Sequence, residues 1–255
     1  MYEIAAYLNQ EFWDTGDAFG TAGSYGFTSA EIPEMYCPAP EDSESRERLR
    51  EAIAASGLQS WWHTLPAHNR HFGSTDEALR SENVQRMEWE LEFVHDLGWD
   101  RFVIHPGSAA DETDKRRVYA ALEGLQEKAA ALGVQLLVEN ASDPFNGDPY
   151  ELARLCDEVP GLALAYDCSH AYRSAYCREG RGSMVDHLKI VVPRVRAIQF
   201  NDYNGTANCD LGEGLLPWEA LLPVVAETPC DTFTIELQTV AETVSSRDTL
   251  LKWFG

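Results

Sequence analysis

The stretch GVQLLVENAS, residues 133–142, has the organisation that decides the fold. A glycine is followed by a short apolar run, and the run ends in a carboxylate, Glu139. The segment before it has helical periodicity, with apolar residues at Val118, Leu122, Leu125, Ala129 and Leu132. Gly133 suits the position just after a helix, where the chain adopts a positive φ. The sequence therefore predicts a unit of helix, glycine, strand and polar side chain.

This unit recurs every 30 to 40 residues along the chain. FTSAEIPE follows Gly26, LQSWWHTLP follows Gly57, WDRFVIHPG follows Gly98, and LALAYDCSH follows Gly161. A second helical pattern, Val84, Met87, Leu91 and Val94, precedes the third of these glycines. In all five units a polar residue comes five to seven positions after the glycine, near the predicted end of the strand: Glu31, His63, His105, Glu139 and Asp167.

Three further segments complete a set of eight predicted strands. They are EIAAYLN at residues 3–9, VRAIQFN at 195–201 and TFTIEL at 232–237. Eight strands separated mostly by helices, in 255 residues of which 44% are hydrophobic, predict an α/β fold, a (β/α)8 TIM barrel forming a single domain over residues 1–255. The main competitor is an open doubly wound sheet, but the sequence has no G-x-G-x-x-G or P-loop motif for a nucleotide in such a sheet.

The charge of the chain argues against two classes of partner. With 42 acidic and 20 basic residues, the net charge of −22 would repel nucleic acid and anionic lipid. No apolar run approaches the roughly 20 residues of a membrane span, and the N-terminus does not resemble a signal peptide. Six scattered cysteines without a C-x-x-C pair favour free thiols in a reducing compartment. We therefore expect a cytoplasmic protein with no nucleic-acid or membrane partner.

The polar strand ends predict a metal site. Side chains at the C-terminal ends of barrel strands converge on one mouth, and Gln199 and Glu236 end the last two predicted strands. A buried carboxylate without a partner costs several kcal/mol. Glu139, Asp167 and Glu236, in a chain with only four lysines, therefore suggest a divalent cation. His170 follows Asp167 by three residues, so it either approaches the metal site or faces solvent.

Six short motifs, in this order, resemble those of a known family. They are HPGS (105–108), VEN (138–140), DCSHAY (167–172), QFND (199–202), LGEG (211–214) and IEL (235–237). The pattern is similar to that of the xylose-isomerase-like barrels, which include sugar-phosphate isomerases and epimerases, ketose 3-epimerases, hydroxypyruvate isomerases and the endonuclease IV group. The resemblance covers most of the chain.

The resemblance implies a site for one metal ion, held by Glu139, Asp167, Gln199 and Glu236. Most family members have histidine at the third position, whereas the hydroxypyruvate isomerases have glutamine, as here. Their Arg-His-Glu segment is absent from DYNGTANCDLGEG, residues 202–214. Four oxygen donors favour Mn²⁺ or Mg²⁺ over Zn²⁺. Mn²⁺ is the expected ion, with Mg²⁺, Co²⁺ and Zn²⁺ as alternatives.

The activity that the resemblance implies is isomerisation or epimerisation of a small sugar, sugar phosphate or hydroxycarbonyl compound through an enediolate, in carbohydrate metabolism. Glu139 and Glu236 would move the proton on carbon, and the metal would stabilise the developing charge. The expected substrate-binding residues are His63, His105, His170, Arg173 and Glu213. Arg173 suits a phosphate or carboxylate, or is a surface residue. Trp13, Trp61 and Trp62 either line the pocket or fill the core. The family is often dimeric or tetrameric, which is compatible with a homo-oligomer.

Two alternatives stay open. The first is an endonuclease IV-like DNA repair enzyme, because His63 and His105 match positions of additional zinc ligands in that group. Against it, Gly212 stands where that group has a histidine, and the net charge of −22 opposes binding to phosphates. The second is a non-catalytic, lyase-type or dehydratase-type barrel in which Gln199 marks a modified metal site.

Overall fold

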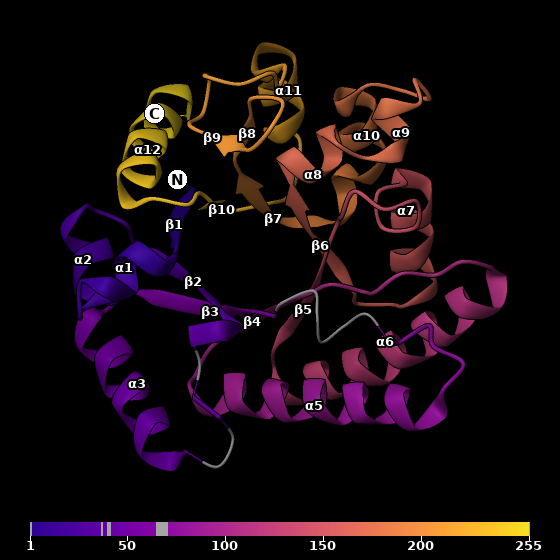
Figure 1. Ribbon diagram of the computed structural model, residues 1–255, viewed down its shortest axis with the longest axis horizontal. Coiled ribbons are helices and arrows are strands. Elements are labelled where there is room, and N and C mark those ends of the chain that lie inside the picture. The colour runs from indigo at the N-terminus through magenta and orange to yellow at the C-terminus, as the bar shows by residue number, and fades with distance from the viewer. Residues whose placement is uncertain (1, 37, 40–41, 65–70, 255) are drawn as a thin grey trace.

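Eight parallel strands close into a barrel, as the repeating unit predicts (Figure 1). The structure is a computed structural model that describes residues 2–36, 38–39, 42–64 and 71–254. Each strand pairs with its neighbours in chain order, and β1 closes the barrel by pairing with β10. The barrel strands are β1 (Glu3–Tyr7), β2 (Ser29–Pro33), β3 (Gln59–His63), β4 (Arg101–Ile104), β5 (Gln135–Glu139), β6 (Ala163–Asp167), β7 (Val195–Phe200) and β10 (Thr232–Ile235).

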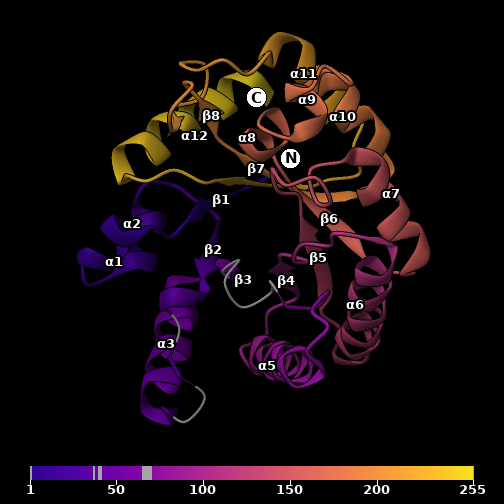
Figure 2. The same ribbon diagram turned by 45° about the vertical axis from the view of Figure 1, so that its right-hand side comes forward.

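Helices surround the strands on the outside (Figures 1 and 2). The long helices α5 and α6 pack side by side, and α12 covers the junction of β1 and β10. The α-helices are α1 (Gln10–Asp14), α2 (Ala18–Ser24), α3 (Ser43–Ser56), α5 (Glu77–Asp96), α6 (Glu112–Leu132), α7 (Pro149–Glu158), α8 (Cys168–Tyr172), α9 (Ala175–Arg178), α10 (Met184–Val191), α11 (Trp218–Val225) and α12 (Val240–Phe254). Two 3-10 turns, Glu34–Tyr36 and Val192–Arg194, and a two-stranded hairpin of β8 (Asp202–Tyr203) and β9 (Asn208–Cys209) complete the fold.

The glycines before the strands have the backbone conformation that the sequence predicts. Gly26, Gly57, Gly98, Gly133 and Gly161 have φ values of 81°, 68°, 76°, 72° and 94°. L-residues with a Cβ avoid this left-handed region. Two of these glycines, Gly57 and Gly133, are the C-caps of α3 and α6. The repeat is therefore a physical unit, since each glycine turns the chain from a helix into the next strand.

Residues of β1, β3, β4, β5, β6 and β7 divide between two separate hydrophobic clusters, whereas β2 and β10 contribute only to the outer one. The cluster inside the barrel is small and consists of Ala5, Trp61, Val103, Leu137, Ala163, Ala165 and Ala197. One tryptophan among several alanines fills the narrow interior. The outward residues join the much larger cluster under the helices, which includes the helical stripes Met87, Leu91 and Val94 of α5 and Val118, Leu122, Leu125 and Ala129 of α6.

Of the tryptophans Trp13, Trp61 and Trp62, the last two are fully buried and Trp13 is half-buried. Trp61 is in the barrel interior, and Trp62 points the other way and donates from Nε1 to Glu90 on α5 at 3.1 Å. Trp13 stacks on Tyr36 and donates to the carbonyl oxygen of Leu8. Of the two interpretations, the contacts favour core packing for Trp61 and Trp62.

Five cysteines are free thiols: Cys156, Cys168, Cys177, Cys209 and Cys230. The sixth, Cys37, lies outside the described residues. Within the described ranges, no helix has both the length and the apolar character needed to span a membrane.

A pair of alanine substitutions tests the role of the glycine caps. A Cβ at Gly133 or at Gly124, inside α6, would meet nothing within 4 Å outside its own helix and chain neighbours. We expect Gly133→Ala to lower the free energy of unfolding by about 1–2 kcal/mol, because its φ is positive. Gly124→Ala should raise it by about 0.5–1 kcal/mol, because alanine favours a helix. Urea unfolding measures both values, and a similar effect of the two substitutions would contradict the cap role.

Candidate active site at the strand ends

The polar residues that the sequence places at strand ends meet inside one end of the barrel. His63, Glu139 and Asp167 are the last residues of β3, β5 and β6, and His105 and Glu236 directly follow β4 and β10. Gln199 lies one residue before the end of β7, next to Asp167 in the sheet register. Glu31 lies one layer deeper, in the middle of β2 and beside Trp61. Because alternate residues of a strand face inward, these side chains share the barrel interior.

A buried chain of charges crosses this interior. Glu31 Oε1 lies 2.7 Å from His63 Nδ1, and His63 Nε2 lies 2.8 Å from Glu139 Oε2. Burial alone would lower the pKa of His63, but Glu139 and Glu31 raise it well above its usual value. Burial would likewise raise the pKa values of the two glutamates, yet His63 holds that of Glu31 down, and His105, His63 and His170 hold that of Glu139 well below its usual range. The contacts join Glu31, His63 and Glu139 into a triad, and these shifts favour a protonated His63 between two carboxylates.

Three more groups hold Glu31 in place. Trp61 Nε1 donates to its Oε2 at 3.0 Å, and the Thr234 hydroxyl donates to the same oxygen at 2.6 Å. The Gln199 amide donates to Oε1 at 2.9 Å. Glu31 is thus fully engaged within the protein, which makes it a positioning residue for His63.

His105 is a neutral imidazole beside the triad. Its Nε2 lies 3.1 Å from His63 Nε2 and 3.7 Å from Glu139 Oε2. Burial lowers its pKa to about 4, despite the opposing effect of Glu139. The unprotonated ring keeps a lone pair that can bind a cation or accept a hydrogen bond.

Asp167 is positioned by two asparagines. Asn201 donates from Nδ2 to Asp167 Oδ2 at 2.6 Å, and the Asn140 side chain bonds both the backbone N–H and the carbonyl oxygen of Asp167. The other carboxylate oxygen accepts from the backbone N–H of His170 and from the Ser169 hydroxyl. Burial and the charge of Glu139 raise the pKa of Asp167, against the effect of His170.

His170 lies on the short helix α8, with about a third of its side chain exposed. Its Nε2 is 3.8 Å from Glu139 Oε1, so the turn after Asp167 does bring the imidazole to the cluster. Of the two sequence-based interpretations, the contacts favour proximity to the site over a solvent-facing side chain.

Two buried oxygens in the site have no hydrogen-bond partner in the described part of the chain. One is Oε1 of Gln199, whose amide nitrogen donates to Glu31 and, at 3.3 Å, to Glu139. The other is Oε2 of Glu236. Burial and the charge of Glu139 raise the pKa of Glu236 well above its usual value. Two unpartnered oxygens, one from a carboxyl group that is buried among other acids, fit the neighbourhood of a cation.

Three overlapping groups of side chains have ligand atoms within 4.8 Å of one another. They are His63, His105 and Glu139; Glu31, His63 and Glu236; and Glu139, Asp167 and His170. Glu139 links the first and third groups, and His63 links the first and second. The donor atoms at this end of the barrel therefore suit a divalent cation in more than one position.

Tyr7 is a site residue that the sequence analysis missed. It ends β1 beside Glu31 in the sheet register, and its ring meets the edge of His63 at 5.9 Å. Burial and the charges of Glu236, Glu31 and Glu139 raise its pKa. The segment EIAAYLN could have indicated it, because Tyr7 lies two residues after Ala5 and therefore on the same inward face of the strand.

Two predicted substrate-binding residues lie away from the cluster. Arg173 donates to the carbonyl and hydroxyl oxygens of Ser169 and lies 5.1 Å from the Tyr203 ring. Glu213 is exposed on the loop after β7. Among the described residues, no hydrogen bond or ion pair joins either side chain to the triad.

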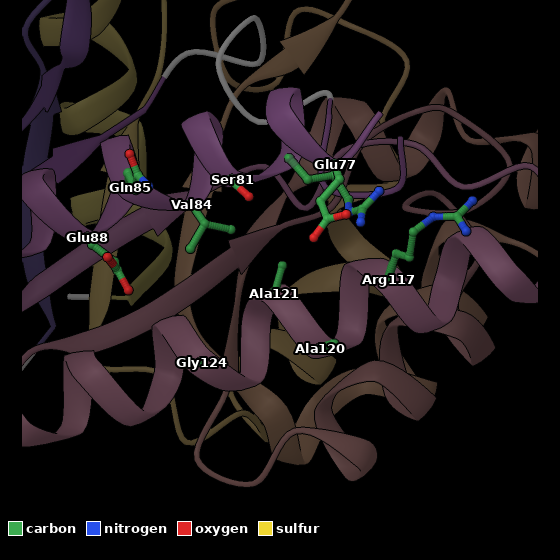
Figure 3. A pocket seen from close by; sticks show the side chains of 10 residues that line it. Glu77, Ser81, Val84, Gln85, Glu88, Arg117, Ala120, Ala121 and Gly124 are labelled. Atoms are coloured by element: carbon green, nitrogen blue, oxygen red, sulfur yellow. The ribbon is translucent and has the colours of Figure 1, made fainter. Parts of the chain in front are cut away.

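A pocket of about 440 Å³ opens beside the cluster. His105 and His170 form part of its wall, together with Gly107, Ser108, Ala141, Asp143 and Asn146. A second pocket, of about 540 Å³, lies on the outer surface between α5 and α6 and is lined by helical side chains such as Val84, Arg117 and Ala121 (Figure 3). None of the strand-end residues lines that outer pocket, so the pocket at the mouth is the candidate substrate site.

Known proteins share this architecture. A structure of a D-tagatose 3-epimerase-like protein superposes with a TM-score of 0.81 at 17% identity, covering 99% of this chain and 97% of the other. The IOLI protein with a bound zinc atom gives 0.77 at 16% identity, covering 99% and 98%. The 3-keto-D-glucoside 4-epimerase YcjR of E. coli gives 0.71 at 16%, covering 99% of each chain. At these identities the likeness establishes the fold. A search of curated proteins found no match.

The family itself is established by a match over most of the chain. Residues 19–253 match the model of the xylose isomerase-like TIM barrel family. This match spans all of the barrel strands except β1, and it confirms the resemblance carried by the six short motifs. The chain therefore belongs to the xylose isomerase-like TIM barrel family.

Proposed function

We propose that the protein is a metal-dependent isomerase or epimerase of a small sugar-like carbonyl compound. The observation that carries the proposal is the pair Glu139 and Glu236, which come from β5 and from the end of β10 and each lie in a cluster with His63. Two carboxyl groups on different strands can act on a carbon between them, one removing a proton and the other returning it. Solved structures of an L-ribulose 3-epimerase, a D-tagatose 3-epimerase-like protein and a 4-epimerase have the same fold and support this reaction class by analogy.

The proposed metal ligands are Glu139, Asp167, Gln199 and Glu236. Their oxygen donors favour Mn²⁺, and the nearby imidazoles of His63 and His105 make Zn²⁺ the main alternative. When bound, the ion would supply Lewis-acid stabilisation of the negative charge that develops on substrate oxygens. The unpartnered oxygens of Gln199 and Glu236 are the structural support for this ligand set.

The remaining residues have distinct proposed roles. Glu31 and His63 hold Glu139 in one orientation through the triad, so the base does not swing when substrate enters. His105 and His170, on the pocket wall, bind substrate hydroxyl or carbonyl oxygens. Tyr7, on the strand between those of Glu31 and Glu236, would donate from its hydroxyl group, because burial and these acids raise its pKa and keep it protonated.

The acid–base pair is tested by amide substitutions. Glu139→Gln and Glu236→Gln should each reduce exchange of the α-proton with D₂O by about 100- to 10,000-fold. Proton NMR of D-fructose, D-tagatose and D-ribulose incubated with Mn²⁺-loaded protein measures the exchange. Glu219→Gln, on the exposed surface of α11, is the matched control and should exchange like the wild type. Near-normal exchange in either active-site variant, with the fold intact by circular dichroism, would remove this mechanism.

The proposed ligand role of Gln199 is tested by metal binding alone. Gln199→Leu should weaken Mn²⁺ binding by at least about tenfold, because it removes an oxygen donor. Gln199→His should retain or tighten binding, because imidazole is a stronger ligand than a neutral amide. Titration followed by electron paramagnetic resonance of free Mn²⁺ gives both affinities. Unchanged affinity in Gln199→Leu would show that the residue is not a ligand.

A hydrolytic activity on DNA is the second candidate. The observation that favours it is the convergence of His63, His105 and Glu139, which could hold an additional metal ion. The net charge of −22 opposes it, because binding to DNA depends on neutralising phosphates. Incubation of the Zn²⁺-loaded protein with abasic-site DNA is expected to leave the DNA intact. Cleavage that is lost on His105→Ala would establish this candidate instead.

A further inference from the structure

Carboxylates of the protein itself occupy six of the helix N-termini. The N-terminus of a helix binds phosphate readily, because its first N–H groups are free and its dipole favours negative charge. In this barrel, α2, α3, α5, α6, α7 and α8 each begin with an aspartate whose side chain accepts those N–H groups: Asp17, Asp42, Asp76, Asp111, Asp148 and Asp167. Each of these N-termini already holds an anion.

The loop after β7 is filled in the same way. This region and the loop after the eighth strand form the usual phosphate site of barrel enzymes. Here Asp202, which is fully buried, accepts from the backbone N–H groups of Gly212 and Leu216 at 3.0 and 3.1 Å. It also accepts from Trp218 Nε1 at 2.7 Å. The donors that a phosphate would need are bound to the protein's own carboxylate.

The start of α12, after β10, is occupied as well. The backbone N–H of Val240 donates to Glu11 Oε2 at 2.8 Å. The backbone N–H and the hydroxyl of Thr239 donate to Glu242 Oε2 at 3.1 and 2.8 Å. Carboxylates therefore take up backbone donors in both halves of the usual phosphate site, although the N-terminus of α11, at Pro217, has no side-chain cap.

Few cations are available near the mouth to replace these donors. A segment joins each strand to the long helix after it. In the described parts of these segments, which exclude residues 65–70, the Lys and Arg residues are Arg173, Arg178 and Arg181. Arg181 pairs with Asp148 at 2.6 Å, and Arg173 is bound to Ser169 and stacked on Tyr203. Arg178 is exposed on α9.

A bound metal ion would not make the site positive. The proposed ligands contribute three carboxylates and one neutral amide, so a divalent ion leaves a charge of +2 − 3 = −1. Asp143 adds a further carboxylate on the wall of the 440 Å³ pocket. A second anionic group on the substrate would meet repulsion in this partly buried space.

We propose that the substrate is an uncharged polyhydroxy carbonyl compound, without phosphate or carboxylate, whose hydroxyl groups are bound by the polar wall of the pocket at the mouth. The proposal rests on the proposed function for the reaction, but its evidence is the charge arrangement alone. Asp143 and Asn146 provide hydrogen-bond acceptors on that wall, and the imidazoles of His105 and His170 provide ring nitrogens.

Matched pairs of sugars test the proposal. D-fructose is compared with D-fructose 6-phosphate, and D-ribulose with D-ribulose 5-phosphate, by α-proton exchange in D₂O with the Mn²⁺-loaded protein. We expect kcat/KM to be at least about tenfold higher for the neutral member, and the ratio to fall as NaCl rises from about 20 to about 500 mM, because salt screens the repulsion. Equal or faster exchange of the phosphate esters would overturn the proposal.

A cation introduced on the pocket wall provides a second test. Ser108 lines the pocket and is exposed, so a long side chain fits there without disturbing the core. Ser108→Arg should reduce the preference for the neutral sugar by about fivefold or more, whereas Ser108→Gln, a long neutral control, should leave it unchanged. A preference that is the same in both variants would show that charge does not cause the discrimination.

A binding measurement separates this proposal from the proposed function. Saturation-transfer NMR detects binding of each sugar without turnover, with inorganic phosphate as a competitor. Binding of the neutral sugars without proton exchange would remove the isomerase proposal and support the neutral-substrate proposal. Tighter binding of the phosphate esters, or displacement of bound sugar by inorganic phosphate at low millimolar concentration, would overturn the neutral-substrate proposal whatever the exchange result.

Discussion

The placement of several acids in one buried space is the constraint on which the site depends. Each buried ion costs several kcal/mol unless opposite charge and hydrogen bonds compensate. His63 compensates Glu31 and Glu139, and the two asparagines and a helix N-terminus compensate Asp167. Glu236 has no comparable partner in the described chain, so the charge balance of the site is incomplete without a proton or a cation. The barrel supplies a rigid frame in which this imbalance can persist.

The fold and the location of the site could be predicted from the sequence because both follow from short periodicities. Glycines at helix ends and apolar runs of four to six residues define each unit, and the inward phase of each run identifies residues such as Glu139 and Asp167. The internal pairing of the site could not be predicted. The register between β2 and β3 pairs Pro33 with His63, so Glu31 lies one layer lower. From there its carboxylate contacts the His63 ring. No local pattern encodes that relation between two strands.

The same limit explains which residues were missed. Asn140 and Asn201 stand inside the motifs VEN and QFND, but their role is to hold Asp167, which becomes visible only when β5, β6 and β7 are adjacent. Asp202 belongs to QFND as well. It organises the loop that follows through hydrogen bonds to residues that lie ten to sixteen positions further along the chain. Arg173 and Glu213 are expected at the substrate from their neighbourhood in the sequence. The Arg173 side chain stacks on Tyr203 and that of Glu213 faces solvent, and their substrate-binding role stays a prediction. Proximity along the chain is a weak guide at a site assembled from eight strands.

Gln199 donates hydrogen bonds to two carboxylates and also keeps an unpartnered oxygen, and one imidazole could do both less completely. Its amide nitrogen has two N–H groups, and Glu31 and Glu139 lie within reach of it. Its oxygen remains without a protein partner and is free to bind a cation. A neutral histidine that coordinates a metal through one nitrogen has a single N–H left, so it could satisfy only one of the two carboxylates. In the proposed metal site, glutamine at this position would bind the ion less strongly than histidine, but it would hold both glutamates and keep the four proposed donors oxygens.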